Sequence, residues 1–151
     1  EPHLRPRRSR SAVRVVVRSG DRVLLFADTD PGVPGSRWWV TPGGGMDPGE
    51  TEIETALREL AEETGFHARA EDLVGPLMRR VAAHGYSDQI CEQTETFYLL
   101  RVPQFTLDTS GHTAEEQVTL AGHAWVPLAS LADVPEPIWP QQLATLASCG
   151  C

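Results

Sequence analysis

Residues 43–66 combine many carboxylates with almost no basic side chains. The segment GGGMDPGETEIETALRELAEETGF contains six glutamates and one aspartate, and its only base is Arg58. Like charges at helical spacing repel each other, and a solvated helix face normally offsets them with a basic residue four positions away. Hard divalent cations such as Mg²⁺ bind carboxylate oxygens and water. The segment therefore favours a metal site over the alternative, an ordinary solvated face made of a good helix-forming residue.

A helix must hold these carboxylates in register. Thr51 followed by Glu54 is a capping-box pattern that starts the helix at Glu52, and Gly65 is a typical stop. One side of this helix is predicted to be buried, through an apolar stripe made of Ile53, Ala56, Leu57, Leu60 and Ala61.

Three glutamates share the helix side next to this stripe. At about 100° per residue, Glu63 lies about 40° to one side of Glu59, and Glu62 lies about 60° to the other. Arg58 is about 100° away from Glu59, so the Glu59 and Glu63 pair is expected to lack a basic partner. Glu52 falls near the same line two turns earlier.

Three glycines lie before the helix, in what the sequence predicts to be a loop. Gly43, Gly44 and Gly45 allow the backbone to come close to a ligand and to adopt positive φ. Their carbonyl or amide groups could therefore reach a metal or a phosphate at the start of the helix.

The other predicted elements surround this segment with strands. A hairpin is predicted at residues 12–18 and 22–28, and a short strand at WWVT. Two more strands are predicted at residues 94–102 and at AGHAWVPL, and a closing helix at PIWPQQLATLAS. In that closing helix the apolar residues expected on one face are Ile138, Leu143, Leu146 and Ala147. Strands on both sides of a central helix indicate one mixed α/β domain.

The spacing of the fixed residues resembles the Nudix box, which reads glycine, five residues, glutamate, seven residues, then Arg-Glu, apolar, any, Glu-Glu, any, Gly, apolar. Gly44, Glu50 and residues 58–66 match every fixed position. The resemblance implies a Nudix fold, an α/β fold with a mixed β-sheet sandwiched between α-helices. It also implies hydrolysis of a phosphoanhydride bond in a nucleoside diphosphate linked to another group, as in a nucleotide sugar, ADP-ribose or a (deoxy)nucleoside triphosphate.

The resemblance also implies roles for single residues. The cofactor would be Mg²⁺, with Mn²⁺ as a substitute, and its ligands would be Glu59, Glu62, Glu63 and the carbonyl of Gly43. Arg58 and Glu50 would form an ion pair that orients these carboxylates. The general base would be a box glutamate, Glu62 or Glu63, or a glutamate of a later loop, Glu115 or Glu116, and the spacing does not choose between them.

Four further residues are candidates for contacting the substrate: Trp39, Gly44, Gly45 and Tyr86. Trp38 and Trp39 point to opposite faces of a strand, so at most one faces the core. Packing in the core is the alternative for either indole.

Composition narrows the class of protein. The chain has 151 residues, 40% of them hydrophobic, with 13 Arg, no Lys and a formal charge of -8. These values suit one soluble domain, and no apolar run approaches the length of a membrane span, so we expect a cytoplasmic protein. We assign residues 1–10 to a flexible basic arm, 11–148 to the Nudix domain and 149–151 to a tail.

The charge distribution bears on partners. Residues 1–22 carry seven arginines and two acids, a balance of +5, which leaves -13 on the rest. Such an acidic domain repels polyanions, so a small nucleotide is the expected partner, nucleic acid is not, and mRNA-cap-type hydrolysis is disfavoured. The other alternative is a Nudix-fold module that senses a nucleotide without cleaving it. Dimers are common in the family, so a homodimer stays open.

Overall fold

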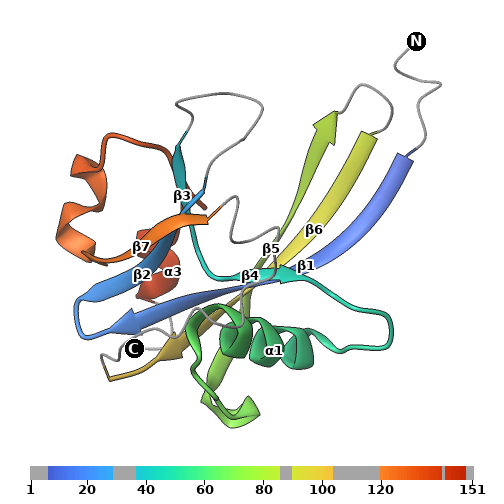
Figure 1. The fold of residues 1–151 in the computed structure, drawn as a ribbon, viewed down its shortest axis with the longest axis horizontal. Helices are drawn as coiled ribbons and strands as arrows, with labels where there is room; N and C mark the ends of the chain where they lie inside the picture. Colours follow the sequence, from blue (N-terminus) through green and yellow to red (C-terminus); the bar gives the residue numbers. More distant parts are fainter. Residues whose placement is uncertain (1–6, 29–36, 86–89, 104–119, 141, 149–151) are drawn as a thin grey trace.

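The computed structural model describes residues 7–28, 37–85, 90–103, 120–140 and 142–148. Within these ranges the chain forms one eight-stranded sheet and two α-helices (Figure 1). The helices are α1 (Glu52–Thr64) and α3 (Leu143–Ala147), and short 3-10 turns cover Ala70–Asp72 and Leu128–Asp133. None of the described helices is long and apolar enough to cross a membrane.

The sheet is mixed. Its main path runs β5-β6-β1-β2-β3-β8, with β4 also paired to β1 and β7 to β2. The strands are β1 (Arg7–Ser19), β2 (Arg22–Asp28), β3 (Trp38–Val40), β4 (Gly43–Gly45), β5 (Leu73–Gly85), β6 (Ile90–Arg101), β7 (Leu120–Pro127) and β8 (Ile138–Trp139). The β1–β6 and β3–β8 pairs are parallel, and the other pairs are antiparallel.

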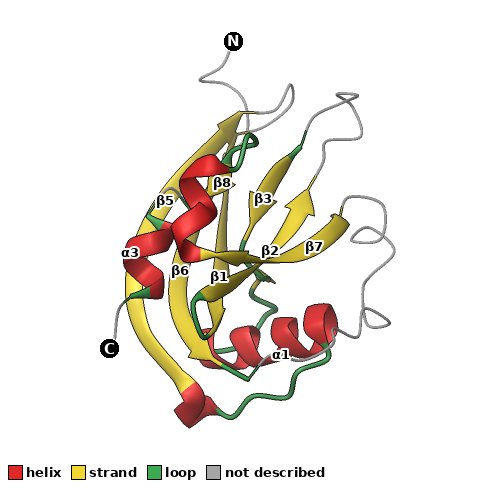
Figure 2. Ribbon diagram, turned by 90° about the vertical axis from the view of Figure 1, so that its left-hand side faces the viewer, coloured by secondary structure: helices red, strands yellow, loops and turns green. Residues whose placement is uncertain are grey.

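Strand β1 lies at the centre of the fold and is buried on both faces. Val13, Val15 and Val17 pack in a cluster with Ala56 and Leu60 of α1. Val16 faces the other way, into a second cluster with residues of α3. The two helices therefore cover opposite faces of the sheet, and both can be followed in Figure 2. This arrangement confirms the expected mixed sheet between helices.

Three boundaries differ from the sequence expectations. Strand β1 begins at Arg7, because it pairs with β6 from Ile90 onward, so residues 7–10 do not form an arm. The three glycines form strand β4, not a loop, and pair with residues 12–14 of β1.

The predicted closing helix is also shorter than expected. Ile138 belongs to β8 and pairs with Trp39 of β3, and the helix starts only at Leu143. Pro137 and Pro140 explain this difference, because proline does not fit a helix interior and restricts the residue before it. Leu143, Leu146 and Ala147 are buried on one face, as predicted.

Candidate active site

Helix α1 has the limits that its sequence predicts. The amide of Glu54 donates to Thr51 Oγ1 at 3.1 Å, and the amide of Thr51 donates to Glu54 Oε1 at 2.9 Å. At the other end Gly65 adopts a left-handed φ of 77° and donates to the carbonyl of Ala61. These caps fix the helical register of every glutamate that follows Thr51.

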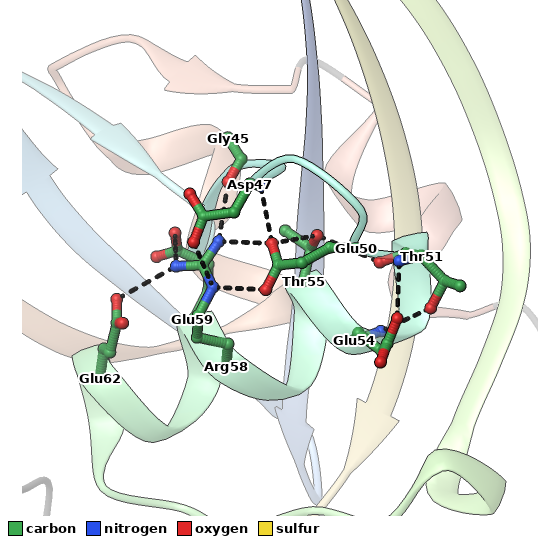
Figure 3. A network of polar contacts seen from close by, with 9 residues as sticks. All are labelled: Gly45, Asp47, Glu50, Thr51, Glu54, Thr55, Arg58, Glu59 and Glu62. Carbon is green, nitrogen blue, oxygen red and sulfur yellow. Dashed lines mark hydrogen bonds and ion pairs between the residues drawn. The ribbon is translucent and has the colours of Figure 1, made fainter.

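Arg58 ties the helix to the segment before it (Figure 3). Its Nε lies 2.7 Å from Glu50 Oε2, and its Nη2 donates to Glu50 Oε1 and to the carbonyl of Gly45, both at 2.9 Å. Glu50 also accepts from the amide of Asp47 and the hydroxyl of Thr55. These contacts, led by the hydrogen bond from Arg58, lower the pKa of Glu50 to about 2. Glu50 is therefore an anion at neutral pH and an anchor for Arg58.

The same guanidinium reaches two of the predicted metal ligands. Its Nη1 lies 2.9 Å from Glu59 Oε1 and 3.4 Å from Glu62 Oε2. The expectation that Glu59 lacks a basic partner is therefore wrong. An angular separation of about 100° places the Cα atoms, whereas a long arginine side chain curls back along the helix surface and closes the gap.

Glu59 and Glu63 are buried against β4. They are 7% and 4% exposed, and the amide of Gly43 donates to Glu63 Oε2 at 3.2 Å. Burial raises the pKa of Glu59, the charge of Glu62 adds to the rise, and Arg58 and a hydrogen bond with Glu63 act against it. Two carboxylates are thus held together where a negative charge is costly.

Gly44 leaves the space that the Glu59 carboxylate fills. A Cβ at this position would lie 2.5 Å from Oε1 of Glu59 and 2.7 Å from its Cδ. Only glycine therefore permits strand β4 to lie directly against the carboxylate. This contact gives a physical reason for the glycine that opens the box.

The donors around β4 suit a hard cation. Glu59 and Glu63 supply buried oxygens, Glu62 is one-third exposed, and the carbonyl of Gly43 accepts a long contact of 3.3 Å from Arg14 Nη1. Among the described residues, no three His, Cys, Asp or Glu side chains are arranged as a complete metal site. A cation would therefore have to draw in Glu62, whose 3.4 Å contact with Arg58 is the longest of that guanidinium's carboxylate hydrogen bonds.

Glu52 does not join this group. It accepts from Thr96 Oγ1 at 2.5 Å, Arg79 Nη2 at 2.9 Å and Tyr98 Oη at 3.3 Å, all on β5 and β6. Burial by itself would raise the pKa of Glu52, but the hydrogen bonds from Thr96 and Arg79 outweigh it and the pKa is lowered. Glu52 thus binds the first turn of α1 to the sheet. Its carboxylate does not join Glu59 and Glu63, with which helical spacing aligned it.

A cavity of about 470 Å³ opens on the face of β1 that is opposite to α1. Its lining includes Arg14, Trp38, Arg80, Glu95, Phe97 and Trp139. Trp39 does not line it. Trp39 packs against the α3 cluster and donates from Nε1 to Glu136 at 2.9 Å. Strand alternation gives Trp38, not Trp39, the cavity face, and a contact between Trp39 and the substrate stays a prediction.

Sequence reasoning missed the charged lining of this cavity. Arg14, Arg80 and Glu95 lie on three different strands and meet only through strand register. The one available signal was an ionisable residue inside each strongly β-forming run. Tyr86, Glu115 and Glu116, predicted for substrate contact or as general bases, lie outside the described residues.

Comparison with known proteins finds a matching family model and several relatives. The model of the NUDIX domain family matches residues 8–149. An RNA pyrophosphohydrolase of Psychrobacter cryohalolentis is 35% identical over 78 residues, which cover 46% of this chain and 45% of that protein. A Nudix hydrolase of Rhodococcus erythropolis, described as uncharacterized, is 32% identical over 131 residues, covering 83% of this chain and 68% of that protein.

The fold has counterparts among solved structures. A MutT NUDIX hydrolase of Burkholderia pseudomallei superposes with a TM-score of 0.61 at 18% identity, covering 93% of this chain and 99% of that one. This identity supports the fold alone. The chain spans less than half the length of the first curated relatives that it matches.

Proposed function

The chain belongs to the NUDIX family, and on that premise we propose that it is a pyrophosphohydrolase dependent on a divalent metal. The proposed reaction is hydrolysis of a phosphoanhydride bond in a nucleoside diphosphate linked to a further group. Mg²⁺ is the proposed cofactor, with Mn²⁺ able to replace it.

One observation carries this proposal: two buried carboxylates face each other under a glycine strand. Glu59 and Glu63 are almost fully buried, and the pKa of Glu59 is raised chiefly by that burial. Arg58 offsets part of the charge on Glu59 and the Gly43 amide binds Glu63, yet the raised pKa of Glu59 means that two buried carboxylates still carry a cost. A divalent cation converts this repulsion into binding energy, and oxygen donors are the ligands that Mg²⁺ prefers.

The residues would divide the work as follows. Glu59, Glu62, Glu63 and the Gly43 carbonyl would hold the cation, which would neutralise charge on the phosphoanhydride oxygens. Arg58, anchored by Glu50 at 2.7 Å, would keep Glu59 and Glu62 in place. The attacking water needs a base within hydrogen-bonding reach, and Glu62 or Glu63 would serve, with Glu115 and Glu116 as the alternatives.

A triphosphorylated RNA end is a second candidate substrate, because one relative is named as an RNA pyrophosphohydrolase. It carries the same bond as a free nucleoside triphosphate. The net charge of -8 favours the small nucleotide, since the acidic surface repels an extended polyanion.

The test is turnover by a variant that loses only one charge. Glu63→Gln should reduce Mg²⁺-dependent release of phosphate or pyrophosphate by at least about 100-fold while circular dichroism stays unchanged. Glu54→Gln is the matched control: it removes the same charge from the same helix, and glutamine still completes a capping box. The substrate panel should include nucleotide sugars, ADP-ribose, nucleoside triphosphates and a 5′-triphosphorylated RNA.

Two outcomes would reject the proposal. Undiminished turnover by Glu63→Gln would contradict the assignment of this carboxylate as a metal ligand. Thermal stabilisation of the wild-type protein by a nucleotide, with no product released across the panel, would instead identify a sensing module.

A further inference from the structure

The cavity is joined to the buried carboxylates through one glycine. The amide of Gly43 donates to Glu63 on the α1 side of β4, and its carbonyl accepts from Arg14 Nη1 at 3.3 Å on the other side. Arg14 in turn contacts Glu95, which contacts Arg80. A nucleotide whose diphosphate lies at Glu59 and Glu63 would therefore have this cavity beside it for another part of the molecule.

The polar groups of the cavity are mostly donors. Among the described residues of its lining the only carboxylate is Glu95, which is 5% exposed and accepts from Arg14 Nε at 3.2 Å, Gln93 Nε2 at 3.1 Å and Arg80 Nε at 2.8 Å. Each guanidinium carries five N–H groups and donates only its Nε–H to Glu95. Two positive charges against one negative, on side chains that are partly exposed, leave N–H donors to which a ligand with acceptors can bind.

The walls of the cavity are aromatic. Trp38 comes from β3, Trp139 from β8 and Phe97 from β6, and Trp139 is 40% exposed. The Arg80 guanidinium lies 5.5 Å from the centre of the Phe97 ring, which together with Glu95 fixes its plane. Aromatic walls and a planar donor group suit a flat heterocycle with acceptors on its edge.

We propose that this cavity holds the nucleobase and that Arg14 and Arg80, positioned by Glu95, select bases with an oxo group over bases with an amino group. Guanine presents O6 and N7 as acceptors, whereas adenine replaces the O6 acceptor with an N6 amino donor. That amino group would face guanidinium N–H groups and leave donors opposed to donors. This inference names the substrate class for the proposed pyrophosphohydrolase and rests on that function.

The first test compares bases on the wild-type protein. We expect kcat/KM for GTP and ITP to be similar, because both carry O6 and N7, and to exceed that for ATP by about 10- to 100-fold. The difference should lie mainly in KM, since the base is remote from the bond that breaks. Equal or better use of ATP would overturn the inference while leaving the hydrolase proposal intact.

A substitution at Arg80 supplies the second test. Glutamine can pair with N6 and N7 of adenine. Arg80→Gln should therefore lower the ratio of kcat/KM for GTP to kcat/KM for ATP at least about 10-fold, by lowering the value for GTP and raising the value for ATP. Arg79→Gln is the matched control, because the preceding side chain points to the opposite face and pairs with Glu52 at 2.9 Å. An unchanged ratio in folded Arg80→Gln, or an equal change in Arg79→Gln, would reject the assignment of Arg80.

Binding separates this inference from the catalytic proposal. Calorimetric titration of the wild-type protein with GDP, IDP and ADP should give a lower Kd for GDP and IDP by about 10-fold or more. This preference is expected even if no nucleotide is hydrolysed, in which case only the proposed activity fails. A Kd for ADP at or below that for GDP would overturn the proposed base selection, whether or not the protein hydrolyses nucleotides. Because this titration uses the wild-type protein, it decides the question even if Arg80→Gln does not fold.

Discussion

Replacing Gly44 with alanine would test whether the fit between β4 and α1 sets activity. The new Cβ would lie 2.5 Å from Glu59 Oε1, where ordinary contact starts at 3.4 Å. The carboxylate would therefore have to move by about 0.9 Å, the difference between these two distances. Glu59 is 7% exposed and held by Arg58 at 2.9 Å, so it cannot simply turn into solvent.

The size of the effect follows from this displacement. A misplacement of about 1 Å in a reacting group costs on the order of 100-fold in rate, so we expect kcat/KM of Gly44→Ala to fall by about that factor. Overpacking should also cost about 1–3 kcal/mol of stability. Each kcal/mol corresponds to a loss of about 2–4 °C in Tm for a domain of this size.

Gly20→Ala separates lost activity from lost stability. Gly20 has φ of 58°, and a Cβ added there would meet no atom within 4 Å, so alanine costs about 1 kcal/mol through backbone strain alone. We expect Gly20→Ala to lower Tm but to keep its kcat/KM, measured at saturating Mg²⁺ on the best substrate of the panel. The reasoning fails if Gly44→Ala keeps wild-type kcat/KM, or if both variants lose activity equally.

Three further predictions concern the metal, the arginine and the cavity. Mg²⁺ at about 100 times its Kd should stabilise the wild-type protein by about 2.7 kcal/mol, seen as a rise in Tm that Glu63→Gln lacks, and a Tm indifferent to Mg²⁺ would contradict the metal site. Arg58→Lys should lower kcat/KM about 10- to 100-fold with the helix content intact, because one ammonium cannot reproduce the five hydrogen bonds of the guanidinium. Burial alone would raise the pKa of Glu95, but Arg14 and Arg80 outweigh it and hold that pKa below the ordinary 4.5. The resulting stability is present above pH 4.5 and lost as pH falls through the lowered pKa, so Glu95→Gln should flatten the acid side of a Tm profile against pH.

Local patterns in the sequence predicted α1 correctly in every detail that depends on neighbouring residues. The cap at Thr51, the start at Glu52 and the stop at Gly65 all follow from interactions within four positions along the chain. Strands β2, β3 and β7 were also predicted, because β-branched and aromatic runs between turn residues favour extended backbone.

Predictions that depended on side-chain reach or on strand partners were less successful. Arg58 neutralises Glu59 because a long side chain bends, which a helical projection of Cα positions leaves out. The glycines became a strand because residues 12–14 offered free backbone groups to pair with. Ile138 lies in a strand and not in the predicted helix, because it pairs in parallel with β3 and because proline does not fit a helix interior.

The sequence by itself determined the helix that carries the carboxylates, since a fixed rise and turn per residue convert spacing into position. It also determined the family through the spacing of the Nudix box. Only the tertiary structure decided that Trp38 and not Trp39 lines the cavity, and that Arg14, Arg80 and Glu95 meet there. These residues are brought together by the register of β1, β5 and β6, and register is set by packing across the whole sheet, not by any neighbour along the chain.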